Sequence, residues 1–165
     1  MNINMRKITE YEPMSKDNEI KFGDVIGLSL SRSAVYELED KMKNSDFNIG
    51  LTTEHFFSPG IYTRILYIPK GCMLTGKIHK EPILNIMIAG EISVLLGNEI
   101  KRIKAPYICV SPAGSKKIGY AHEDTIWMGC HGTDDFDIVK IEKRFVAQDE
   151  NEWLEYSTKQ LELGF

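Results

Sequence analysis

Short runs of β-forming residues, each ended by a turn signal, fill the chain from Leu51 to His131 and constrain its fold more than any other feature. The runs are rich in Ile, Val, Tyr and Thr, and a turn-forming residue stands at each break. The breaks are Ser58-Pro-Gly, Pro69-Lys-Gly, Leu96-Gly-Asn, Ala105-Pro, Pro112-Ala-Gly and His122-Glu-Asp. Regularly spaced short strands of this kind are typical of an antiparallel barrel or sandwich. We therefore expect a mainly β fold with at least six strands.

Two of these runs carry strand signatures of their own. Between Ile61 and Ile68 the side chains alternate, so that Tyr62 and Arg64 share one face of the expected strand. Farther along, residues 91–96 and 99–104 flank Gly97-Asn98, a pair that tolerates the positive φ of a tight hairpin turn. The second pattern predicts a β-hairpin.

Helices are expected on both sides of the β region. Ser31 or Ser33 can cap a helix that runs to about Lys43, in which apolar residues recur at helical spacing. Downstream of the strands, Thr133 or Asp134 can cap a second helix with an apolar stripe. The flanking helices would pack on the barrel or on another subunit.

The chain is the length of one ordinary domain, since it has 165 residues. Within it we expect an N-terminal arm and helix over 1–50, a β-barrel over 51–132 and a C-terminal helical segment over 133–165. Residues 1–22 lack a sustained period and are interpreted as an extended arm.

Charge and apolar run lengths limit the partners. A formal net charge of −4 argues against binding to a nucleic-acid polymer, which requires a dense basic face. The longest apolar runs, 83–89 and 92–96, are too short to span a bilayer, and no signal-peptide pattern is seen, so we expect a cytoplasmic protein. Cys72, Cys109 and Cys130 are odd in number and widely spaced, which predicts reduced thiols.

Two stretches, GCMLTGKIHKEPILNIMIAG from Gly71 and PAGSKKIGYAH from Pro112, resemble the paired strand motifs of the cupin superfamily. Gly71, His79, Gly90 and Pro112-Ala-Gly match the cupin skeleton. The resemblance implies a cupin-like jelly-roll β-barrel with flanking N- and C-terminal helices. The usual metal ligands are replaced, because Lys77, Ile83 and Lys117 stand where two histidines and a glutamate are expected.

From Phe56 onward the chain also resembles small cupin-like proteins of tailed phages and prophages. The matching text is FFSPGIYTRILYIPKGCMLTGKIHK, LNI, APYICVSPAGSKKIGYAHEDTIW and CHGTDDFD. This resemblance indicates a family and no activity, and for a viral protein it implies the host cytoplasm.

Replacing imidazoles by ammonium groups changes what a cupin-like pocket attracts. Lys77 and Lys117 would repel a metal cation and attract an anion into the same space. We therefore predict a small anionic ligand, with a nucleotide as the leading class. The predicted ligand-binding residues are Lys77, His79, Asn85, Lys117, Tyr120 and His122. In the alternative reading, both lysines extend from the barrel rim into solvent.

Two other functions stay open at this point. A metal-dependent isomerase or oxygenase would use Zn, Fe or Mn held by His79, His122 and His131, with Glu81 as a further oxygen ligand. A virion or assembly component would use the barrel as a scaffold and the terminal helices for contacts. No Ser-His-Asp set, Walker loop or dinucleotide glycine pattern is seen, so the sequence favours binding, without a cofactor, over catalysis. Helices at both ends also favour a homo-oligomer.

Overall fold

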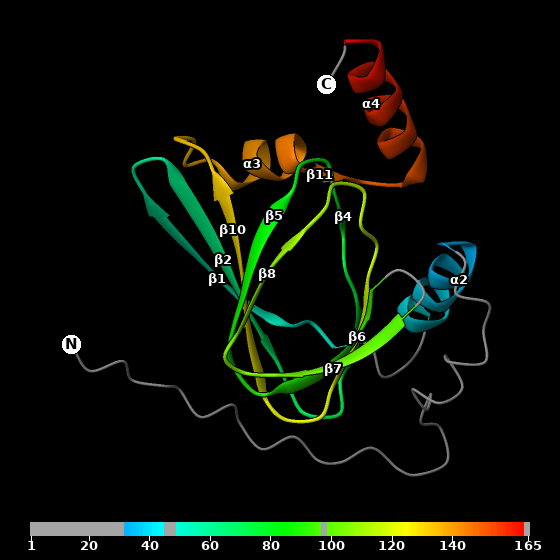
Figure 1. Ribbon diagram of the computed structural model, residues 1–165, viewed down its shortest axis with the longest axis vertical. Coiled ribbons are helices and arrows are strands. Elements are labelled where there is room, and N and C mark those ends of the chain that lie inside the picture. The colour runs from blue at the N-terminus through cyan, green and yellow to red at the C-terminus, as the bar shows by residue number, and fades with distance from the viewer. Residues whose placement is uncertain (1–31, 45–48, 97–98, 164–165) are drawn as a thin grey trace.

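The computed structural model describes residues 32–44, 49–96 and 99–163 of the chain. The expected arm over 1–22, the Ser31 cap and the Gly97-Asn98 turn lie outside the described residues. Two antiparallel sheets face each other and form a barrel (Figure 1). The larger sheet has the order β1 (Thr52–Ser58), β2 (Ile61–Ile68), β10 (Thr125–Gly132), β5 (Ile83–Ala89) and β8 (Tyr107–Ser111). The smaller sheet has the order β3 (Met73–Thr75), β9 (Ile118–Ala121), β6 (Glu91–Leu96) and β7 (Glu99–Lys104).

The order of the strands identifies the fold. From β2 onward the chain crosses repeatedly between the sheets, so that β2, β5, β8 and β10 belong to the larger sheet and β3, β6, β7 and β9 to the smaller. Eight strands wound in this way form a jelly roll. The predicted mainly β jelly roll with flanking helices is confirmed, and β6 and β7 pair as the expected hairpin.

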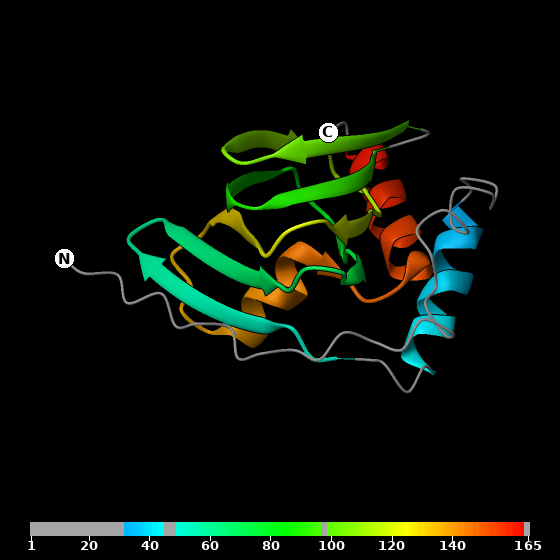
Figure 2. The same ribbon diagram turned by 90° about the horizontal axis from the view of Figure 1, so that it is seen from below.

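The helices occupy different sides of the barrel. Helix α2 (Arg32–Lys43) follows the predicted span and packs Val35 and Leu38 on Leu95 and Ile118 of the smaller sheet. Figure 2 shows α2 on the opposite side of the molecule from the β1–β2 hairpin. Among the described residues, no helix is long and apolar enough to cross a membrane.

Helix α3 (Ile138–Phe145) begins later than the sequence predicts. Its N-cap is Asp137, whose carboxylate accepts hydrogen bonds from the backbone N–H groups of Val139 and Lys140. The predicted caps, Thr133 and Asp134, are therefore wrong. The Thr133 hydroxyl instead accepts from the N–H of Asp135 at 3.1 Å, which forms a local turn before the helix.

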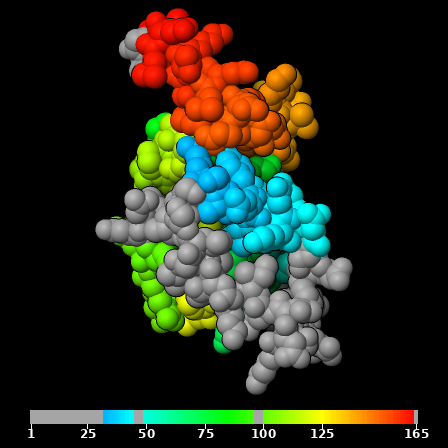
Figure 3. Space-filling view, turned by 90° about the vertical axis from the view of Figure 1, so that its right-hand side faces the viewer, coloured from blue at the N-terminus to red at the C-terminus, as the bar shows by residue number. Residues whose placement is uncertain are grey.

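Helix α4 (Glu150–Glu162) is capped by Asp149 and projects from the barrel beside α2 (Figures 1 and 3). Tyr36 of α2 donates to the Glu150 carboxylate at 2.6 Å and joins the two helices. Between α3 and α4, the short strand β11 (Val146–Ala147) pairs with β4 (Ile78–His79). The C-terminal segment is thus hydrogen-bonded to the barrel. The division of the chain into 1–50, 51–132 and 133–165 stays a prediction.

The barrel interior has an apolar layer at each end and a polar layer between them. Ile68, Met87, Ile92, Val94 and Ala121 form the largest buried cluster between the sheets. At the opposite ends of β2 and β10, α3 covers the barrel and packs Ile141 and Phe145 on Tyr62. The polar side chains of the interior lie between these two apolar layers.

Gly90 has a structural reason to be glycine in the motif skeleton. Its φ is +90°, which disfavours any residue with a Cβ, and a Cβ there would overlap the backbone of Asp124 and Thr125. The glycine therefore permits the close turn from β5 into β6 that joins the two sheets. The three cysteines form no disulfide, as the sequence predicts.

Candidate functional site

The candidate site is the polar layer beneath α3. Alternation along β2 directs Tyr62 and Arg64 inward, and β10 places His131 opposite Tyr62 in register. His79 comes from β4, and Lys117 precedes β9 of the facing sheet. Residues far apart in the sequence thus converge at one end of the barrel.

Two imidazoles form the centre of this layer. The ring centroids of His79 and His131 are 5.4 Å apart, with 29° between the ring planes. The His131 ring also lies 4.5 Å from that of Phe145 and 6.0 Å from that of Tyr62. The Nδ1 atom of His79 is buried and has no hydrogen-bond partner among the residues that the structure describes. Buried polar atoms are almost always paired, so this atom indicates that a ligand or water completes the site.

Burial and neighbouring cations keep both imidazoles neutral. The pKa of His79 is lowered to about 3, first by burial and then by His131, Arg64, Lys117 and Lys77. The pKa of His131 is lowered to about 4 by burial, Arg64 and Arg144. Positive groups therefore act on His79 from several sides of the layer. Such a field attracts anions and opposes cations.

Lys117 supplies a cation without an anionic partner. Its ammonium donates to the hydroxyl of Ser111, and burial lowers its pKa. Among the described residues, no carboxylate pairs with it. A half-buried ammonium with only a neutral partner raises the free energy of the fold. An anion bound beside Lys117 would stabilise it.

Lys77 lies at the rim of the barrel and is paired. Its side chain is 47% exposed, and its Nζ lies 2.8 Å from the Glu142 carboxylate of α3. Arg64 approaches the same carboxylate at 3.6 Å. Hydrogen bonding to Lys77 lowers the pKa of Glu142, so the carboxylate remains charged. Glu142 thereby links α3 to two cations of the site.

Asn85 is buried at the site, and its amide has three hydrogen-bond partners. It donates to the Ile83 carbonyl at 3.0 Å and to the Ser111 hydroxyl at 2.8 Å, and it accepts from the Trp127 indole N–H at 3.0 Å. Both of its N–H groups are thus occupied, and its contact with a ligand stays a prediction. Asn85 positions Ser111, which in turn contacts Lys117.

Tyr120 and His122 are not brought to the other predicted residues. Both fall on the outer face of the smaller sheet, the face on which Ile118 packs against α2. The Nε2 of His122 lies 2.7 Å from the Ser93 hydroxyl, and the His122 ring stacks edge-on with that of Tyr120. The two residues point away from the barrel interior and do not share a face with Lys117, and their contact with a ligand stays a prediction.

The described residues do not fit the three-histidine metal site. His79 and His131 are adjacent, but His122 is bonded to Ser93 on the outer face. Glu81, the further candidate, approaches Arg144 at 3.7 Å. Within the described ranges, no three His, Cys, Asp or Glu side chains are grouped to hold a metal ion. Two imidazoles among cations are an unsuitable donor set for Zn, Fe or Mn.

Three further residues of the polar layer are absent from the ligand-binding set predicted from the sequence. Arg64 shares a face with Tyr62 by the strand period, and the burial of Tyr62 and Ile68 shows that this face is the inner one. Ser111 is the inward residue at the end of β8, a position that its alternation with Cys109 indicates. Glu142 lies on a helix far along the chain, and no local signal shows that it reaches Lys77.

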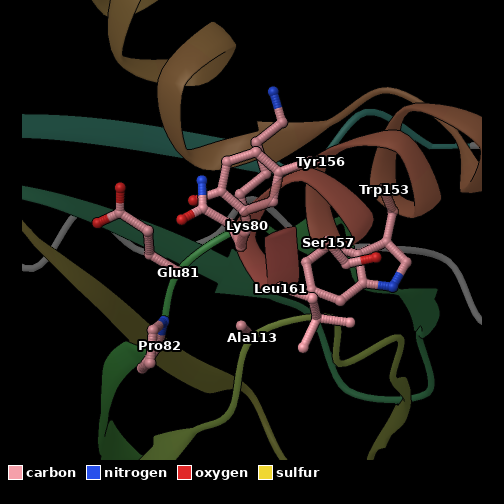
Figure 4. Close-up of a pocket in the computed structure, with 9 residues that line it drawn as sticks. Lys80, Glu81, Pro82, Ala113, Trp153, Tyr156, Ser157 and Leu161 are labelled. Carbon is pink, nitrogen blue, oxygen red and sulfur yellow. The ribbon is translucent and has the colours of Figure 1, made fainter. Parts of the chain in front are cut away.

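A separate surface groove runs along α4 (Figure 4). Its volume is about 410 Å³, and α4 contributes aromatic and polar side chains to one wall. The residues lining it are Lys80, Glu81, Pro82, Ala113, Trp153, Tyr156, Ser157, Gln160 and Leu161. The Nζ of Lys80 lies 2.6 Å from the Glu152 carboxylate and 2.9 Å from the Lys143 carbonyl, so this buried cation is satisfied. None of the residues predicted from sequence to bind the anion lines this groove.

No protein-family model and no curated protein matches the chain. Among solved structures, it is similar to KdgF from a Halomonas species, with 15% identity over 57% of this chain and 88% of that one and a TM-score of 0.46. An RmlC-like cupin from Shewanella frigidimarina shows 17% identity over 56% of this chain and 85% of that one, with the same TM-score. The cupin domain of Schizosaccharomyces pombe Cnp3 shows 16% identity over 61% and 77%, with a TM-score of 0.42. The jelly-roll fold is assigned from the strand order of this chain.

Proposed function

We propose that the chain binds a small anionic molecule in the polar layer beneath α3. The observation that supports this most directly is the buried, unpartnered Nδ1 of His79 among groups that lower its pKa by their positive charge. A neutral imidazole carries one N–H, and an anion would fix that proton on the nitrogen facing it. The bond would satisfy the buried Nδ1 of His79, which lacks a partner in the described ranges.

The same anion would compensate Lys117. Charge-assisted hydrogen bonds from an ammonium or a guanidinium to an oxyanion are about twice as strong as neutral ones. Within the described part of the chain, the Ser111 hydroxyl is the one hydrogen-bond partner of the Lys117 ammonium. Arg64 shares Glu142 at 3.6 Å, longer than an ideal ion pair. Both cations therefore have hydrogen-bonding capacity to offer an oxyanion.

A nucleotide is our leading ligand class, bound without turnover. His79, Lys117 and Arg64 can donate hydrogen bonds to a phosphate, whereas both N–H groups of Asn85 are occupied and Tyr120 lies on the outer face of the smaller sheet. We therefore expect weak discrimination between bases and strong dependence on phosphate charge. If the protein is of phage origin, its role would be to sequester a nucleotide signal of host defence in the host cytoplasm.

Calorimetric titration with sulfate, inorganic phosphate and nucleoside monophosphates and diphosphates tests the proposal. Lys117→Met keeps the length of the side chain and removes its charge, and we expect a tenfold or larger loss of affinity, about 1.4 kcal/mol or more, as for a lost hydrogen bond to a charged group. Lys104→Met is the matched control, because Lys104 is exposed on the smaller sheet and should leave affinity unchanged. Absence of binding by all these anions, or equal loss in both variants, would overturn the proposal.

Mass spectrometry of the titrated samples separates binding from catalysis. Recovery of the nucleotide intact after denaturation of the protein is the expected result. Conversion of the nucleotide to product would favour the alternative of an enzyme instead.

A further inference from the structure

Glu142 places a carboxylate of α3 next to two cations of the polar layer. The Lys77 ammonium donates a hydrogen bond to its Oε1 at 2.8 Å, and the Nη1 of Arg64 lies 3.6 Å from the same oxygen. A separation of 3.6 Å is too long for a hydrogen bond. Glu142 is therefore bonded to Lys77, whereas it attracts Arg64 without a direct hydrogen bond.

Arg64 lies between this carboxylate and the two imidazoles. Its positive charge lowers the pKa of His79 and the pKa of His131, so it acts on both rings. Strand β2 directs its side chain to the inner face of the sheet, which it shares with Tyr62. A guanidinium carries five N–H donors in a planar fork. Arg64 can therefore pair with the carboxylate on α3 or donate to an anion beside His79.

Packing holds Glu142 in this position. Asp137 caps the first turn of α3, and Ile141 and Phe145 pack on Tyr62 beneath the helix. Glu142 follows Ile141 directly in the sequence, and its side chain is 36% exposed. Helix α3 therefore keeps a negative charge at the edge of the proposed anion site.

We infer that Glu142 competes with the bound anion for Arg64 and so limits the affinity of the site. The inference rests on the anion site proposed above. When a ligand bonds Arg64, the guanidinium loses part of its attraction to Glu142, and the carboxylate repels the ligand. A phosphate can overcome both effects because it bonds a guanidinium through two oxygens, whereas chloride offers a single atom. The competition therefore keeps weakly bonding anions out of the site.

Lys77 is then a positioning residue for the ligand. Its hydrogen bond draws the Glu142 carboxylate toward the rim of the barrel, away from a close pairing with Arg64. Within the described part of the chain, Lys77 and Arg64 are the two cations that form ion pairs with Glu142. Without the Lys77 ammonium, Glu142 would pair closely with Arg64, and the ligand would have to displace it. Lys77 thereby raises anion affinity without contacting the anion.

Sulfate titration calorimetry of the full chain tests the competition. We expect Glu142→Gln to raise sulfate affinity about tenfold, because glutamine keeps the length of the side chain and removes its charge. Glu91→Gln is the matched control, since Glu91 is also shared by an arginine and a lysine, Arg102 and Lys104, but lies on the smaller sheet. Its affinity should equal that of the wild type. Circular dichroism should show an unchanged fold in both variants.

A double-mutant cycle tests the role of Lys77. Lys77→Met should weaken sulfate binding about fivefold in the wild type and by less than about twofold in the Glu142→Gln background. A direct contact between Lys77 and the anion would give the same loss in both backgrounds, which would overturn the positioning role.

The outcomes separate this inference from the anion site itself. No sulfate binding by the wild type and by Glu142→Gln would overturn both. Binding by the wild type that is unchanged or weaker in Glu142→Gln would overturn the competition and leave the anion site in place. An equal gain in Glu91→Gln would mean a general effect of net charge and would also overturn it. Binding detected in Glu142→Gln alone would support both.

Discussion

His79 and His131 make the stability of the fold depend on pH. Unfolded imidazoles have a pKa of about 6.5, whereas burial lowers those of the folded ones to about 3 and about 4. Their stabilising contribution is complete above pH 6.5 and is lost as pH falls toward the folded values, because the unfolded chain then binds more protons. We expect the free energy of unfolding, measured by urea titration, to fall between pH 6.5 and pH 5, before most carboxylates titrate.

The variant His131→Phe isolates this effect. Phenylalanine fits among Phe145 and Tyr62 and does not titrate, so the decline with pH should be about half as steep as in the wild type, where each imidazole contributes up to about 1.4 kcal/mol per pH unit. A wild-type stability that is constant from pH 6.5 to pH 5, in buffers without sulfate or phosphate, would contradict this account.

Anion binding at the site should strengthen as pH falls. A bound sulfate raises the pKa of His79 from about 3, because the negative charge favours the protonated ring, so binding takes up a proton. Sulfate does not titrate between pH 8 and pH 5, and calorimetry over this range should show rising affinity toward acid. His79→Gln keeps a donor but cannot titrate, and its affinity should be nearly constant over the same range. An affinity that falls toward pH 5 in the wild type would refute the role of His79.

The parity of sequence spacing explains which site residues could be predicted. Lys117 and His122 are five residues apart, and an odd spacing along one strand puts side chains on opposite faces. The sequence alone could have separated them. The partners of Asn85 could not have been found in this way, because Ser111 and Trp127 lie 26 and 42 residues away and meet it only through the register of β8 and β10.

The loop between β8 and β9 and helix α4 are packed together at Gly114. This glycine of the Pro112-Ala-Gly motif has a φ of +74°, and a Cβ there would overlap the Trp153 ring. A left-handed backbone conformation costs a residue with a Cβ about 1–2 kcal/mol. We expect Gly114→Ala to lower the free energy of unfolding by more than this, because the Trp153 ring must also move. Urea unfolding followed by tryptophan fluorescence measures the loss.

Gly60→Ala is the matched control for this contact. Its φ is +77°, but a Cβ there meets nothing within 4 Å, so it carries the backbone cost without the overlap. The difference between the two variants reports the packing of α4 against the motif loop. Equal destabilisation would mean that Trp153 moves aside without cost.

The alternation of residues predicts the strands more accurately than the capping signals predict the start of α3. Alternation and turn residues are local, and they indicated the hairpin of β6 and β7 and the strand Ile61–Ile68 within the sequence itself. The choice between Thr133, Asp134 and Asp137 as the cap of α3 depends on where the chain leaves the barrel. Thr133 is held at the end of β10 by a bond from its N–H to the Gly60 carbonyl, which delays the helix.

The two faces of the larger sheet carry different chemistry. His131 points inward from β10, while its neighbour Cys130 points outward, as do the exposed side chains of Ile108 and Val110 on β8. Substitutions at sites that share no partner contribute additively, so a change at Ile108 should leave the polar layer unaffected.

This independence predicts the behaviour of the Ile108→Lys variant. It should bind sulfate with an affinity within about twofold of the wild type, because β8 presents Cys109 and Ser111, not Ile108, to the interior. Its thermal midpoint should still rise with sulfate, by the amount that mass action gives for binding to the folded state alone. Loss of sulfate binding, with the fold intact by circular dichroism, would contradict the independence of the two faces.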